Sequence, residues 1–194
     1  MRFGAISGCV LILMLTHFTA AQSLPSKIRG YKVYNARVLV IIAADASVPN
    51  TRPDATVRVL DPKITGVSLF GATLEIGAEI TALKQSGSVD FITCHNLRVN
   101  GVTIETEEYN YPFAFKEGQM TMLPTPAKIT INIANIAKAA YKELVDSKKD
   151  WIVTGTVFVF GKFKKFGFNF KRVVPIKIGL TIKNPLNSPA LDPR

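Results

Sequence analysis

The stretch from Val67 to Ala82 restricts the possible folds more than any other part of the chain. Small or apolar side chains occupy every second position in it, at Leu74, Ile76, Ala78, Ile80 and Ala82. A period of two residues, rather than 3.6, places one face of an extended strand against a core and the other toward solvent. The stretch therefore predicts a half-buried strand of an antiparallel sheet.

Short apolar or alternating segments recur along the rest of the chain. They predict further strands within residues 31–44, 56–60, 112–115, 127–133, 151–160 and 173–182, and from Val89 onward. Asn100-Gly101 suits a type I′ turn and predicts a two-residue hairpin. The period lengthens after Asn135, a plausible N-cap, and predicts one short helix at about residues 135–147. The pattern favours a mainly β fold, an antiparallel β-sandwich, with a closed sheet around a lumen as the alternative.

The N-terminal 21 residues predict a secretory signal peptide. Arg2 precedes the apolar run Ala5–Ala20, and small residues lead up to a cleavage point near Ala21. A membrane anchor is the competing interpretation, but the run is shorter than the roughly 20 apolar residues of a spanning helix. We therefore expect the protein to be secreted or to reside in the periplasm or cell envelope.

The remaining chain has the length of one domain. We expect a leader with an extra strand over residues 22–55, a sandwich over 56–182 and a disordered, proline-containing tail over 183–194. Cys94 would be the only cysteine after cleavage, so stability must come from packing rather than from an intramolecular disulfide. Burial as a small hydrophobic side chain is its expected state.

Candidate catalytic and metal-binding residues are few. Cys94 and His95 are adjacent, so in a strand their side chains point to opposite faces and do not form a nucleophile and base pair. One Cys and one His also supply too few ligands for a zinc site. Glu105, Glu107 and Glu108 are interpreted as a solvated rim, because no calcium-loop spacing accompanies them. We expect no catalytic residue, no cofactor and no metal.

A basic, aromatic segment runs from Lys162 to Arg172 in a chain of net charge +10. Its alternation favours a strand that begins after a basic turn at Lys162–Lys165 and directs Phe166, Phe168 and Phe170 into the core. The alternative is contact with an anionic membrane surface. That contact would involve Lys162, Phe163, Lys164, Lys165, Phe166, Lys171 and Arg172. Export makes lipid a more accessible partner than nucleic acid, which is not expected to bind.

The order of several segments resembles the late embryogenesis abundant group 2 domain, also called the water-stress and hypersensitive-response (WHy) domain. The resemblance extends over about residues 57–182. It is carried by VSLFGATL at 67–74, VNG at 99–101, ITINI at 129–133, the strand led by Trp151 and KIGL at 177–180.

This resemblance implies an immunoglobulin-like or fibronectin-like sandwich without enzymatic activity, which protects proteins or membranes during desiccation or other water stress. The alternative function is a lipid-binding or apolar-ligand-binding module at the cell envelope, with its ligand between the sheets or near Phe163–Phe170. A third is an adhesion module that uses an exposed strand edge. The expected partners are an anionic membrane surface or client proteins, and the oligomeric state is left open.

Overall fold

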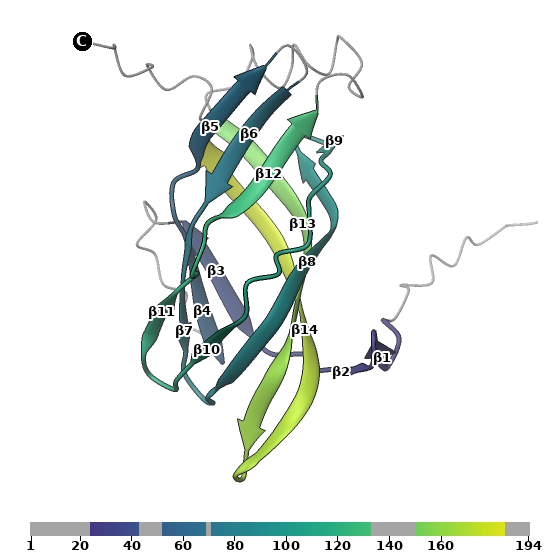
Figure 1. The fold of residues 1–194 in the computed structure, drawn as a ribbon, viewed down its shortest axis with the longest axis vertical. Helices are drawn as coiled ribbons and strands as arrows, with labels where there is room; N and C mark the ends of the chain where they lie inside the picture. Colours follow the sequence, from purple (N-terminus) through teal and green to yellow (C-terminus); the bar gives the residue numbers. More distant parts are fainter. Residues whose placement is uncertain (1–23, 43–51, 69–70, 133–149, 185–194) are drawn as a thin grey trace, which may run out of the picture.

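We analysed a computed structural model, which describes residues 24–42, 52–68, 71–132 and 150–184. The described residues form three sheets (Figure 1). The first sheet contains β1 (Lys27–Ile28), β2 (Tyr31–Val33), β8 (Gly87–Val99), β9 (Val102–Thr103), β10 (Phe113–Phe115), β13 (Asp150–Lys165) and β14 (Phe168–Lys183). The second contains β3 (Val38–Ile42), β4 (Ala55–Val59), β7 (Ala78–Ala82) and β11 (Met120–Met122). The third contains β5 (Lys63–Ser68), β6 (Gly71–Ile76) and β12 (Ala127–Asn132).

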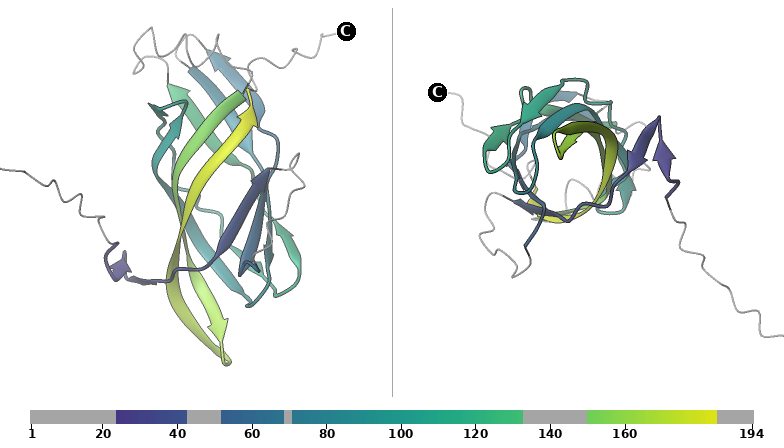
Figure 2. Two further views of the ribbon diagram at one scale, coloured as in Figure 1. Left: turned by 180° about the vertical axis from the view of Figure 1, so that it is seen from behind. Right: turned by 90° about the horizontal axis from the view of Figure 1, so that it is seen from below.

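The three sheets form a mainly β sandwich, as the strand pattern predicts. The long strands β8, β13 and β14 run the length of the molecule, while the second and third sheets lie along its lower and upper halves in Figure 1. The end-on view in Figure 2 shows the strands arranged around a shared interior. Most pairings are antiparallel, but β3 pairs with β4, and β14 with β2, in parallel.

Two apolar clusters form the core of the sandwich. The upper cluster surrounds Trp151, which is 1% exposed, and includes Leu74 and Ile131 from the third sheet. The lower cluster is built around Val89, Phe115, Phe163 and Val174 of the first sheet and Ala82 of the second. Phe160 and Val173 are also fully buried, and the ring of Phe160 stacks on Phe91 at 4.3 Å and meets Tyr31 of β2 edge-on at 5.3 Å.

The alternating stretch from Val67 to Ala82 is not one strand. It contains the end of β5, all of β6 and all of β7, and the chain changes from the third sheet to the second at Gly77. A Cβ at Gly77 would lie 3.0 Å from Leu60 Cδ1, and the Leu60 amide donates to the Gly77 carbonyl over 3.0 Å. Glycine therefore permits the close approach at which the chain changes sheets. The predicted inward face is confirmed at Leu74 and Ala82, which are 3% and 4% exposed.

The hairpin predicted at Asn100-Gly101 is confirmed. Val99 pairs with Val102, and the two turn residues have φ values of 49° and 83°, as a type I′ turn requires. The Asn100 side chain also ties the turn to β13, because its Oδ1 accepts a hydrogen bond from the Ile152 amide at 2.9 Å.

The prediction of a basic turn at Lys162–Lys165 is wrong. These residues continue β13, and the chain reverses one step later, at Phe166-Gly167. The two-residue turn pairs Lys165 with Phe168, so the face that carries odd-numbered residues in β13 carries even-numbered residues in β14. Phe166 lies in the turn itself and therefore does not share a strand face with Phe168. The predicted signal peptide and helix, and all but the first two residues of the predicted tail, lie outside the described residues.

Candidate membrane-contact site at the β13–β14 hairpin

The β13–β14 hairpin extends past the strands that flank it. Phe163 is the last residue of β13 that pairs with β8, opposite Gly87, and the Lys164 amide still donates to the Ser86 carbonyl at 2.8 Å. On the other side, the pairing of β14 with β2 involves only Arg172 and Val173. With a rise of about 3.3 Å per residue, Phe166 lies roughly 7 Å beyond Lys164. The hairpin is the lowest part of the described chain in Figure 1.

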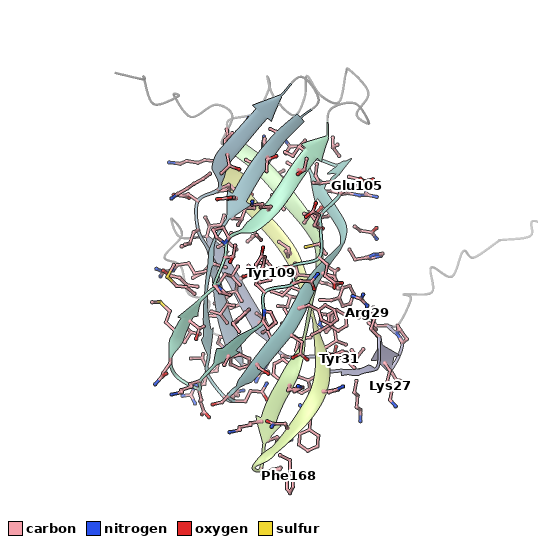
Figure 3. The ribbon with its side chains drawn as sticks, viewed as in Figure 1. Lys27, Arg29, Tyr31, Glu105, Tyr109 and Phe168 are labelled. Carbon is pink, nitrogen blue, oxygen red and sulfur yellow. The ribbon has the colours of Figure 1, made fainter. Side chains whose placement is uncertain are left out.

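Bulky aromatic side chains occupy this projecting end. Phe166 is 86% exposed and Phe168 is 70% exposed, which makes them the two most exposed large apolar residues of the described chain. Figure 3 shows Phe168 at the free end of the hairpin. Phe170, two pairs nearer the core, is 42% exposed. Phe163, which the sequence places in the same candidate surface, is 6% exposed and belongs to the lower core cluster.

The expectation that Phe166, Phe168 and Phe170 face the core is therefore wrong. Phe168 and Phe170 do share a strand face with the buried Phe163, because Phe163 pairs with Phe170 and Lys165 with Phe168. Phe168 and Phe170, however, lie beyond the residues at which β14 pairs with β2, and the described chain leaves them 70% and 42% exposed. Alternation predicts which face a side chain occupies, whereas the length of the neighbouring strands decides whether that face is buried.

Cationic side chains occupy the same hairpin as the exposed rings. Lys162, Lys164, Lys165 and Lys171 are exposed, and among the residues that the structure describes none of them forms an ion pair. Lys165 Nζ lies 5.4 Å from the centre of the Phe166 ring. Amphipathic lysine side chains can cover apolar surface with their methylenes and keep the ammonium group in water.

Arg172 and Lys171 lie nearer the body of the fold. The Arg172 guanidinium carbon is 4.5 Å from the ring centre of Tyr34 and 5.4 Å from that of Phe170. Lys171 Nζ is 5.8 Å from the ring centre of Tyr31. These cation–π contacts orient the cations beside the hairpin base.

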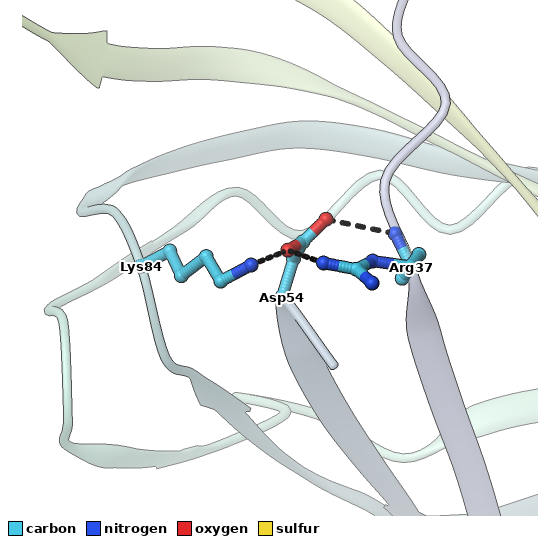
Figure 4. A network of polar contacts seen from close by, with 3 residues as sticks. All are labelled: Arg37, Asp54 and Lys84. Atoms are coloured by element: carbon cyan, nitrogen blue, oxygen red, sulfur yellow. Dashed lines mark hydrogen bonds and ion pairs between the residues drawn. The ribbon is translucent and has the colours of Figure 1, made fainter. Parts of the chain in front are cut away.

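An ion-paired carboxylate borders the same end of the sandwich. Asp54 accepts a hydrogen bond from the Arg37 amide at 2.9 Å and forms an ion pair with Lys84, and the Arg37 guanidinium lies 3.9 Å from its Oδ1 (Figure 4). The hydrogen bond from Lys84 and that from the Arg37 backbone lower the pKa of Asp54. Asp54 thus stays ionised and holds the loop after β7 against the start of β4.

The other candidate residues from the sequence do not assemble into a site. Cys94 is half-buried against the upper cluster, and burial raises the pKa of its thiol, which disfavours the reactive thiolate. His95 is exposed. Glu105 and Glu107 are exposed, while Glu108 pairs with Arg29. Within the described ranges, no three metal-ligating side chains come together.

Within those same ranges, no helix has the length and hydropathy needed to cross a membrane. No family model matches the chain, and no curated protein matches it. A crystal structure of a protein from Archaeoglobus fulgidus is similar at 13% sequence identity. The match covers 66% of this chain and 95% of that chain with a TM-score of 0.37, a likeness too weak to support a conclusion about function.

Proposed function

We propose that this protein is an exported, non-enzymatic binding module that attaches to an anionic lipid surface through the β13–β14 hairpin. The observation that carries the proposal is the exposure of Phe166 and Phe168, 86% and 70%, at a projecting tip flanked by lysines without ion pairs among the described residues. At this exposure the two rings bury little apolar area in the isolated fold and contribute little to its stability. Insertion into a lipid interface would bury both.

The dimensions of the hairpin suit such an interface. Interfacial elements place their apolar side roughly 5–10 Å deep at the boundary between headgroups and acyl chains. The tip, which projects roughly 7 Å beyond Lys164, would reach that depth while Lys162, Lys164 and Lys171 remain at headgroup level.

The energies favour reversible attachment. Burying one phenylalanine contributes about 1.5–3 kcal/mol, and each lysine near an anionic surface contributes about 1 kcal/mol. Two rings and three or four lysines therefore contribute roughly 6–10 kcal/mol before the loss of rotational and translational freedom is subtracted. This sum corresponds to a peripheral protein rather than to a permanent anchor.

Co-sedimentation with lipid vesicles tests the proposal. The protein should sediment with vesicles of phosphatidylcholine and phosphatidylglycerol and much less with phosphatidylcholine alone. The double variant Phe166→Ser/Phe168→Ser should lose this binding. Ile152→Ser is the matched control, because Ile152 is 52% exposed at the opposite end of β13 and should not contribute.

Failure of that experiment would favour a different function. If the protein does not bind either vesicle, but preserves a test enzyme through drying better than an equal mass of an inert globular protein, the stress-protective function implied by the late embryogenesis abundant resemblance gains support. If the Ser/Ser variant binds as well as the parent protein, the hairpin is not the contact surface.

A further inference from the structure

A small apolar cavity lies between the first and second sheets in the lower half of the sandwich. Its volume is about 80 Å³. Side chains of both sheets line it, among them Val57, Ile80 and Ala82 from the second sheet and Phe115, Phe163 and Val174 from the first. An apolar cavity of about 150 Å³ stays dry and takes up benzene. Half that volume suits the narrow end of a hydrocarbon chain better than a ring.

The cavity adjoins a second hollow at the base of the hairpin. Asp54 and Gln85 line both spaces. The second space, here called the basic hollow, has a volume of about 440 Å³ and is lined also by Lys84, Lys164, Lys165 and Phe166. The two spaces therefore adjoin at Asp54 and Gln85, and a single molecule that occupies both would pass these two side chains.

The charges of the basic hollow indicate the sign of its ligand. Three lysines and two carboxylates, those of Asp54 and Glu117, line it. Asp54 is already engaged by Lys84 and Arg37. Lys164, Lys165 and Glu117 form no ion pair with any described residue. Two unpaired cations therefore stand against one unpaired carboxylate, which leaves the hollow favourable to an anion.

We propose that the cavity and the basic hollow together bind one fatty acid molecule. The end of its hydrocarbon chain occupies the cavity, and its carboxylate lies in the basic hollow near Lys164 and Lys165. This site takes a single amphiphile rather than a bilayer surface, so it goes beyond the proposed function and can be tested separately from it.

Titration calorimetry with sodium decanoate, kept below its micelle concentration, provides the test, with 1-decanol as the uncharged probe. Ala82→Val fills the cavity and should weaken decanoate binding about tenfold or more, a change of about 1.4 kcal/mol. Ala72→Val is the matched control, because Ala72 is a buried alanine of β6 that does not line the cavity. It should bind decanoate within about twofold of the parent protein.

The double variant Lys164→Ala/Lys165→Ala should weaken decanoate binding and leave decanol binding unchanged. Circular dichroism checks that Ala82→Val folds, and Ala55→Val, which changes another lining alanine, replaces it if it does not. The inference is overturned if decanoate does not bind the parent protein, or if the folded cavity variant binds it with parental affinity.

A further variant separates this inference from membrane attachment. Phe168 lines neither the cavity nor the basic hollow. Phe168→Ser should therefore reduce vesicle binding and retain decanoate binding. Vesicle binding without decanoate binding would overturn the fatty-acid site alone, and decanoate binding without vesicle binding would overturn the membrane proposal alone.

Discussion

Phe166 occupies the same position in the β13–β14 turn that Asn100 occupies in the β8–β9 turn. Their φ values are 51° and 49°, and each is followed by a glycine, with φ values of 82° and 83°. Asparagine is a favoured residue for this left-handed conformation, whereas a bulky side chain there is a genuine outlier. The protein thus contains both a favoured and an unfavourable residue in one type of turn, and the unfavourable one is the most exposed phenylalanine of the described residues.

Phe166→Asn should therefore stabilise the fold and impair the proposed function together. Relief of the left-handed strain should raise the free energy of unfolding by about 1 kcal/mol, measured by urea denaturation. Loss of the ring should lower vesicle affinity by about tenfold to a hundredfold, since burying a phenylalanine contributes about 1.5–3 kcal/mol.

The reciprocal variant supplies the control. Asn100→Phe should lower the free energy of unfolding by at least as much, because it also removes the hydrogen bond from Ile152 to Asn100 Oδ1. A Phe166→Asn protein that is more stable and still binds vesicles with parental affinity would contradict the role of the turn.

Much of the fold follows from period and turn chemistry. Asn100-Gly101 marks its hairpin because both residues tolerate positive φ, and Leu74 and Ala82 lie on the predicted inward face. The turn at Phe166-Gly167 cannot be predicted in the same way, because phenylalanine is not a favoured turn residue. The sequence pattern does not predict the change of sheet at Gly77 either, because the alternation of apolar and polar residues continues across it.

The candidate site is only partly predictable for a related reason. The basic and aromatic composition of Lys162–Arg172 indicates that a surface contact is possible, but not which rings are exposed. Phe163 and Phe170 are direct partners across the hairpin, yet one is 6% and the other 42% exposed. The difference arises where the neighbouring strands end, and this depends on tertiary packing. That Asp54 and Gln85 line both the cavity and the basic hollow also depends on tertiary packing and cannot be predicted from the sequence.

Salt should weaken vesicle binding through the lysines at the hairpin. At 1 M salt the screening length falls to about 3 Å, so affinity for anionic vesicles should drop strongly. Lys162→Ala/Lys164→Ala should lower affinity at low salt by roughly 2 kcal/mol and flatten the salt dependence. Lys177→Ala, an exposed lysine in the middle of β14, should change neither. An unchanged salt slope in the double variant would show that other cations bind the lipid.

Close contact between β8 and β13 should make Gly161 intolerant of a side chain. A Cβ there would lie 2.2 Å from the Ser88 carbonyl oxygen, and one at Gly87 would lie 2.4 Å from that of Lys162. Gly161→Ala should therefore lower the free energy of unfolding by about 2–3 kcal/mol, as overpacking does elsewhere. Gly179→Ala is the control, because a Cβ at that position of β14 meets no atom within 4 Å. Urea denaturation of both variants checks the difference, and equal stabilities would contradict it.

Acid should weaken the contacts by which Asp54, at the start of β4, holds Lys84 of the loop after β7. Contacts with Lys84 and Arg37 lower the pKa of Asp54 from its ordinary value of 3.8, so the unfolded chain takes up the proton first as pH falls. The stabilisation is complete above that value and is lost as pH drops through the lower pKa of the folded state.

Asp54→Asn keeps the shape of the side chain but removes this charge. It should lower the free energy of unfolding by about 1 kcal/mol near pH 7, and the difference from the parent protein should shrink as pH falls through the lowered pKa of Asp54 in the folded state. Urea denaturation across this range measures the effect. Asp61→Asn serves as the control, because Asp61 is exposed and forms no ion pair with any described residue. A gap between parent and Asp54→Asn that stays constant with pH would mean that hydrogen-bond geometry, rather than charge, holds the loop.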